Sequence, residues 1–126
     1  MNDSNNPAPL VLIADDLPHI IRGWESELSE FGIGAVKATT LRELCARFLA
    51  HEHEIAAVIL DGCIPGDSPN TIPFIQLVRE MGFYKPIVAS SGSSTYRSWM
   101  MRAGCSHEAP KEDAAILVAL LLEQSI

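Results

Sequence analysis

Two short runs of apolar residues in this chain end directly in aspartates. Residues 10–14 are followed by Asp15 and Asp16, and residues 55–60 are followed by Asp61. Continuous apolar runs of this length, with helix-like stretches between them, are typical of the buried parallel strands of an α/β sheet. Parallel strands end at one edge of the sheet, where the sites of open α/β folds form. We therefore expect the three carboxylates to lie close together.

The three aspartates together are a candidate metal site. Carboxylates gathered at one edge repel each other unless a cation lies among them, and ligands that are all oxygen suit a hard ion such as Mg²⁺. Two simpler interpretations remain. Asp15 or Asp16 could cap the helix that follows, and Asp61 could be an ordinary turn residue before Gly62. Because the strand pattern brings Asp61 beside the acidic pair, the sequence favours a Mg²⁺ site made by all three aspartates.

The rest of the chain repeats the alternation of strand and helix. The expected strands cover residues 10–14, 33–38, 57–60, 86–89 and 105–109. The expected helices cover residues 18–31, 41–50, 74–81, 96–103 and 112–124. Pro18 falls in the first turn of its helix, Thr40 can cap the second helix, and Gly32 and Gly104 end the first and the fourth. Five such units predict a doubly wound parallel sheet with helices on both faces.

Size and composition indicate one globular domain. Residues 1–9 are expected to be a disordered lead, and residues 10–126 a single domain that is large enough for a hydrophobic core. The net charge of −7 disfavours binding to nucleic acid or to an anionic membrane, and no apolar segment is long enough to span a bilayer. Three cysteines form neither a metal cluster nor an even disulfide set, which fits a reduced cytoplasmic compartment.

The residues at the ends of the expected strands form an ordered set. In chain order they are Asp15, Asp16, Asp61, Pro65, Gly66, Ser91, Gly92 and Lys111. With this set, the chain from Leu10 onward resembles the receiver domain of two-component response regulators, the CheY-like fold. The resemblance implies a flavodoxin-like (βα)5 sandwich with strand order 2-1-3-4-5.

The resemblance also implies a role for each acidic residue. Asp61 would accept a phosphoryl group from a histidine kinase or a phosphotransfer protein. Asp16 would ligate Mg²⁺ directly and Asp15 through water, while the backbone carbonyl of Cys63 would supply another oxygen. A carboxylate is a poor nucleophile, but a phosphohistidine is a labile donor, so positioning and charge neutralisation suffice for the transfer.

Ser91 and Lys111 complete the set that the resemblance implies. Ser91, favoured over the adjacent Ser90, would donate to a phosphoryl oxygen, and Lys111 would pair with the phosphoryl group as a point charge. Two positions depart from the family pattern. Pro110 precedes Lys111, whereas receivers usually have a proline after this lysine, and Glu108 stands where the family has a switch aromatic. We expect Glu108 to stay solvated or to pair with a cation.

The leading hypothesis is a phosphoacceptor receiver of two-component signalling or a phosphorelay, which switches partner binding when Asp61 is modified. The chain ends soon after the last expected helix, so we expect no output domain. Loss of the phosphoryl group should be slow, because Cys63 and Ser93 are poor groups for positioning a water. One alternative, favoured by the two departures, is a pseudo-receiver that binds partners without phosphorylation. Another is a Mg²⁺-dependent phosphohydrolase, which usually has an acid where this chain has Cys63.

Two of the expected helices carry more apolar residues than one core face needs. The fourth contains Trp99, Met100 and Met101, and the last is apolar nearly all round from Ala114 to Leu122. A helix that is apolar on all sides is normally buried. The face made by these two helices could therefore dock an effector protein or a second copy of the chain. The alternative is a broad core face with tolerated exposed leucines.

Overall fold

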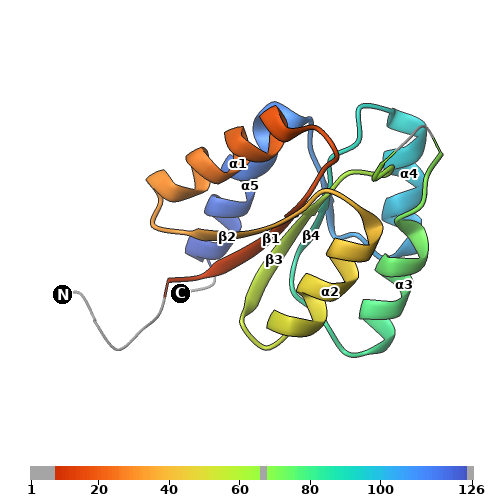
Figure 1. Ribbon diagram of the computed structural model, residues 1–126, viewed down its shortest axis with the longest axis horizontal. Coiled ribbons are helices and arrows are strands. Elements are labelled where there is room, and N and C mark those ends of the chain that lie inside the picture. Colours follow the sequence, from red (N-terminus) through yellow and green to blue (C-terminus); the bar gives the residue numbers. More distant parts are fainter. Residues whose placement is uncertain (1–7, 66–67, 125–126) are drawn as a thin grey trace.

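The computed structural model describes residues 8–65 and 68–124, and its strands form one parallel sheet (Figure 1). The strands are β1 (Leu10–Ala14), β2 (Gly34–Ala38), β3 (Ile55–Leu60), β4 (Ile87–Ala89) and β5 (His107–Glu108). The helices are α1 (Pro18–Glu30), α2 (Leu41–His51), α3 (Ile72–Glu80), α4 (Ser94–Ala103) and α5 (Lys111–Gln124). The strand order is β2-β1-β3-β4-β5 and every pairing is parallel. The predicted fold class and strand order are confirmed.

Helices cover both faces of the sheet, with α1 and α5 on one side and α2, α3 and α4 on the other (Figure 1). Alternate residues of β1 supply the two layers of the core. Leu12 and Ala14 join the cluster under α2, α3 and α4, while Val11 and Ile13 join the cluster under α1 and α5. A strand that is buried on both faces cannot alternate apolar with polar residues. This explains the continuous apolar runs in the sequence.

Local signals fix the ends of several helices as predicted. Pro18 lies in the first turn of α1, and the Thr40 hydroxyl accepts a hydrogen bond from the Glu43 N–H at 3.1 Å at the start of α2. Gly32 follows α1 with φ +73° and Gly104 caps α4 with φ +138°. Residues with a side chain rarely adopt these angles, so both glycines favour the ends that are observed.

Other boundaries differ from the predictions. Helix α3 begins at Ile72, two residues before the predicted start, because the Thr71 carbonyl already accepts from the Ile75 N–H at 3.1 Å. Helix α4 begins at Ser94, because the Ser93 hydroxyl accepts from the Tyr96 N–H at 3.2 Å. Strand β3 is longer than predicted and β5 shorter. Most of the expected lead 1–9 lies outside the described residues, as do Gly66 and Asp67.

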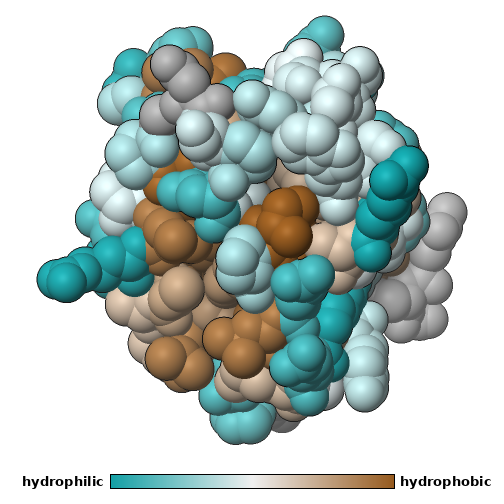
Figure 2. Space-filling view, turned by 90° about the vertical axis from the view of Figure 1, so that its right-hand side faces the viewer, coloured by the Kyte–Doolittle hydropathy of each residue, from teal (hydrophilic) through white to brown (hydrophobic). Residues whose placement is uncertain are grey.

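The surface over α3 and α4 carries hydrophobic groups in several separate places among hydrophilic ones (Figure 2). Of the apolar residues noted in the fourth helix, Met100 belongs to the core. This side chain is fully buried in the core, whereas Trp99 is 43% exposed. On α5, Ile116 and Leu120 are also exposed, while the four residues that face the sheet and α1 are small and buried: Ala114, Ala115, Val118 and Ala119. Among the described helices, none combines the length and the apolar character needed to cross a membrane.

Candidate functional site

The carboxyl ends of β1 and β3 bring the three aspartates together. One carboxylate oxygen each from Asp15, Asp16 and Asp61 lies within 4.8 Å of the other two. The strands are paired in register at Ala14 and Leu60, and the Asp61 N–H donates to the Ala14 carbonyl at 3.0 Å. The backbone therefore fixes where the two strand ends lie relative to each other. The predicted convergence of the carboxylates is confirmed.

Lys111 reaches this cluster from the start of α5. Its Nζ donates to Asp15 Oδ2 at 2.7 Å and lies 3.8 Å from Asp61 Oδ1. The other oxygen of Asp15, Oδ1, accepts from the Leu17 N–H at 2.9 Å. Leu17, not an aspartate, occupies the N-cap position of α1, and no side chain caps this helix. Helix capping therefore does not account for Asp15 or Asp16.

Negative charge is concentrated where solvent is nearly absent. Asp15 is fully buried and Asp61 is 7% exposed. The pKa of Asp61 is raised from its usual 3.8 to about 6: burial is the largest cause, the charges of Asp15 and Asp16 act in the same direction, and Lys111 and the Gly62 N–H oppose them. Among the ion pairs of the described residues, Lys111 is the one basic side chain that contacts these carboxylates. The all-oxygen donor set, in which Asp15 and Asp61 are buried and Asp16 is half-buried, therefore fits a hard divalent cation such as Mg²⁺.

The predicted site residues other than the fully buried Asp15 border one shallow depression of about 360 Å³. Its lining includes Asp16, Asp61, Cys63, Ser91 and Lys111. Asp16 follows β1, Asp61 and Cys63 follow β3, Ser91 follows β4 and Lys111 follows β5. A depression of this volume has room for a small anionic group.

Of the two adjacent serines, Ser91 is the one that borders the depression, while Ser90 is fully buried. Ser91 Oγ accepts from the Ser93 N–H at 3.1 Å. Because this bond uses the oxygen as an acceptor, the hydroxyl hydrogen can still donate to another group. Ser93 caps α4, so the serine-rich segment serves both as a helix start and as a wall of the site.

No protein-family model matches the chain, and no curated protein matches it. Solved structures do match. The receiver domain of a Francisella response regulator superposes with a TM-score of 0.73 at 21% identity, covering 94% of this chain and 99% of that chain. The chain has the receiver-domain fold.

Two further structures extend this comparison. A CheY-like receiver domain protein from Methanospirillum hungatei gives a TM-score of 0.75 at 16% identity, with 93% of this chain and 95% of that chain covered. The receiver domain of the response regulator NarL from Mycobacterium tuberculosis gives 0.75 at 16% identity, with 95% and 97% covered. Likeness at this level of identity establishes the receiver fold, and the chemistry must be argued from the side chains of this chain.

Glu108, at the position where the resemblance to receivers implies a switch aromatic, forms an ion pair. Arg97 Nε lies 3.2 Å from Glu108 Oε1, which confirms that Glu108 pairs with a cation. The same guanidinium donates through Nη1 to the Ser91 carbonyl at 2.7 Å. Arg97 was missed in the sequence analysis, because nothing local links it to residues 6 positions before it and 11 positions after it. Arg97 therefore links Ser91, which borders the depression, to Glu108 of β5.

The loop after Asp61 is held by two residues that the sequence analysis also missed. The Asn70 side chain accepts from the Ile64 N–H and donates to the Ile64 carbonyl, both at 2.9 Å. The Thr71 hydroxyl donates to the Gly62 carbonyl at 3.1 Å. An asparagine that bridges the loop backbone is a common turn signal, and this one could have been recognised from the cluster of turn residues before α3.

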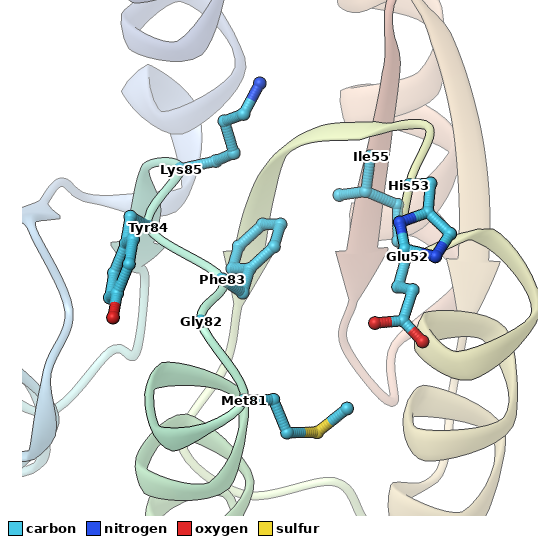
Figure 3. Close-up of a pocket in the computed structure, with 8 residues that line it drawn as sticks. All are labelled: Glu52, His53, Ile55, Met81, Gly82, Phe83, Tyr84 and Lys85. Atoms are coloured by element: carbon cyan, nitrogen blue, oxygen red, sulfur yellow. The ribbon is translucent and has the colours of Figure 1, made fainter.

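A second cavity, of about 280 Å³, lies at the opposite edge of the sheet (Figure 3). Ile55, the first residue of β3, lines it, together with residues that follow α2 and α3. In Figure 3, Met81 extends toward Glu52 while the Phe83 ring lies between the two loops. Asp61 follows the other end of β3, so this cavity is separate from the candidate site.

Proposed function

We propose that this chain is a phosphoacceptor receiver in two-component signalling or a phosphorelay. Asp61 accepts a phosphoryl group from a histidine kinase or phosphotransfer protein in the presence of Mg²⁺, and the modification switches partner binding. The observation that carries the proposal is the group of three carboxylates within 4.8 Å, with Lys111 Nζ beside it, at the strand ends of a receiver fold.

The transfer needs little covalent chemistry from the protein. An Asp61 oxygen forms a bond to phosphorus as the bond from phosphorus to the donor histidine nitrogen breaks, and that nitrogen keeps the electron pair. Mg²⁺, held by Asp15, Asp16, Asp61 and the carbonyl of Cys63, would neutralise the charge that accumulates between carboxylate and phosphoryl oxygens. The residues of the chain supply the positioning.

Two side chains are placed to bind the modified group. Lys111 Nζ is already 3.8 Å from Asp61 Oδ1, and as a flexible point charge it can pair with a phosphoryl oxygen. The Ser91 hydroxyl borders the same depression and can donate. We expect the acyl phosphate to be lost slowly, because Cys63 and Ser93 do not position a water well. Loss within seconds would contradict this expectation.

Partner binding is proposed for the surface formed by α4 and α5. Trp99 is 43% exposed and its ring lies 5.4 Å from that of Tyr96, centroid to centroid. On α5, Ile116 and Leu120 are 43% and 50% exposed. Apolar residues of this size cost free energy in water and are enriched where proteins associate. The occupant would be an effector protein or a second copy of this chain.

One observation favours the alternative, a pseudo-receiver. Lys111 is hydrogen-bonded to Asp15 at 2.7 Å, so the site already holds one compensating charge without a metal ion. The fold would then serve as a binding module in an unmodified state. A phosphohydrolase is disfavoured by Cys63, because a buried thiol two residues after Asp61 is a poor general acid or base.

Intact-mass spectrometry after treatment with Mg²⁺ and acetyl phosphate distinguishes these functions. We expect one phosphoryl adduct in the native protein and none in Asp61→Asn or without Mg²⁺. The matched control is Asp113→Asn, which makes the same substitution at an exposed position of α5 and should leave the adduct intact. No adduct on a protein that binds Mg²⁺ would support the pseudo-receiver instead.

A further inference from the structure

Trp24 of α1 contacts the backbone of the site lysine. Its indole Nε1–H donates to the Lys111 carbonyl at 2.8 Å, across 87 residues of sequence. The side chain is 2% exposed and belongs to the core layer between α1, α5 and the sheet. A buried indole N–H needs a hydrogen-bond partner, and here that partner is the residue whose ammonium group enters the site.

At the start of α5 the Asp113 N–H donates to the Pro110 carbonyl at 3.0 Å, and the Trp24 indole adds a second hydrogen bond, from a distant part of the chain. Lys111 is the first residue of the helix, where the helix dipole disfavours a cation. Pro110 before it has no N–H and can donate no backbone hydrogen bond. A lysine side chain is a flexible stem of four carbons. The position of Nζ therefore depends on how firmly the backbone of the lysine is held.

Side-chain packing around Trp24 and Lys111 does not by itself fix the Lys111 backbone. Trp24 and Lys111 both border a hollow of about 430 Å³ between α1 and the start of α5, together with His19, Gly23 and Glu112. A seam that is open on one side is less constrained by side-chain contacts than a filled one. The hydrogen bond therefore carries more of the alignment between α1 and the first turn of α5.

We propose that Trp24 is a positioning residue for Lys111. By holding the Lys111 carbonyl, it fixes the start of α5 so that Nζ lies 2.7 Å from Asp15 and 3.8 Å from Asp61. The effect of Trp24 on the hydrogen bond between Lys111 and Asp15 is a property of the unmodified protein. The consequence for phosphoryl transfer rests on the proposed function.

The first test measures the coupling between Lys111 and Asp15 by urea unfolding of Lys111→Met, Asp15→Asn and the double variant. The cycle is run in the native background, in Trp24→Phe and in Trp99→Phe, the matched control on exposed α4. We expect Trp24→Phe to weaken the coupling, expressed as a ratio of unfolding constants, by at least about threefold, and Trp99→Phe to leave it unchanged. Equal coupling in all three backgrounds would overturn the proposal.

Trp24→3-benzothienylalanine covers the case in which the phenylalanine variant fails to fold. This side chain has the shape of tryptophan with sulfur in place of the N–H, so the packing stays and the donor is removed. The same loss of coupling is expected.

The second test follows the rate of adduct formation with acetyl phosphate and Mg²⁺. We expect Trp24→Phe to slow the reaction about threefold to tenfold, and the double variant Trp24→Phe with Lys111→Met to be no slower than Lys111→Met alone. Additive slowing would show that Trp24 acts on folding in general and would overturn the proposal. If the native protein forms no adduct, the proposed function fails, and the unfolding cycle still decides the role of Trp24.

Discussion

Lys111 Nζ and Asp15 Oδ2 are hydrogen-bonded at 2.7 Å, although 96 residues separate them in the sequence. This bond joins the start of α5 to the end of β1 and neutralises one carboxylate of the cluster. The lysine does not fully compensate Asp61, whose pKa is raised to about 6 by burial and by its acidic neighbours. The site therefore favours a further positive charge, and this bias underlies the first two predictions.

Asp61→Asn should stabilise the metal-free protein at neutral pH. The pKa of Asp61 is higher in the folded state, about 6, than the usual 3.8, so ionisation of this group costs stability as the pH rises through both values. With allowance for partial solvent screening, the free energy of unfolding should rise by about 1–2 kcal/mol at pH 7. This gain should vanish below the usual pKa of 3.8. Urea unfolding from pH 4 to pH 8 in EDTA measures it. A gain that grows toward acid pH would contradict the argument, and Asp113→Asn is the control.

Mg²⁺ should stabilise the protein, and its removal by EDTA should lower the melting temperature. The stabilisation follows the binding equation and reaches about 2.7 kcal/mol when the free ion is at one hundred times its dissociation constant. Asp16→Asn should lose most of this effect. Lys111→Met should bind Mg²⁺ at least about threefold more tightly, because a competing positive charge is removed. Isothermal titration calorimetry measures the affinities, and weaker binding by Lys111→Met would be the opposite of what we expect.

Arg97→Met should destabilise the protein more than Glu108→Gln. The Arg97–Glu108 pair is partly exposed, with 24% and 49% of the side chains accessible, so breaking it should cost less than about 1 kcal/mol. Arg97→Met also removes the bond to the Ser91 carbonyl, which adds about 1–2 kcal/mol. Chemical unfolding compares the two, with Glu25→Gln in the exposed Lys37 pair as control. Equal costs would mean that the bond to Ser91 contributes nothing.

Two glycine substitutions should change stability in opposite directions. Gly23 lies inside α1, and a Cβ there would meet nothing within 4 Å, so Gly23→Ala should stabilise by about 0.5–1 kcal/mol. Gly104 has φ +138°, and a Cβ would lie 3.0 Å from Arg79 Cγ. Gly104→Ala should therefore destabilise by about 1–3 kcal/mol. Thermal melts of the pair check both signs.

A feature could be predicted from the sequence when the residues that determine it lie close together along the chain. The position of Asp61 follows from the apolar run 55–60, because such a run fixes both the strand and the edge at which it ends. The sequence did not distinguish the buried Met100 from the exposed Trp99, because α4 has few apolar residues from which to assign a core face.

Contacts distant in the sequence leave no local pattern. Periodicity placed Trp24 correctly on the core face of α1, but it could not identify the carbonyl that its indole would meet 87 residues later. Pairing of Glu108 with a cation was one of two predicted outcomes, the other being solvation, and Arg97 could be identified as the cation only from the structure, where α4 lies beside β5.

Phosphorylation of Asp61 is tested most directly by locating the modified residue. Sodium borohydride reduces an aspartyl phosphate to homoserine, so peptide sequencing by mass spectrometry after treatment with acetyl phosphate and Mg²⁺ identifies the acceptor. We expect homoserine at position 61 alone, and only when Mg²⁺ is present. Homoserine at another aspartate, or an unchanged Asp61 in a protein shown to bind Mg²⁺, would contradict the proposed function.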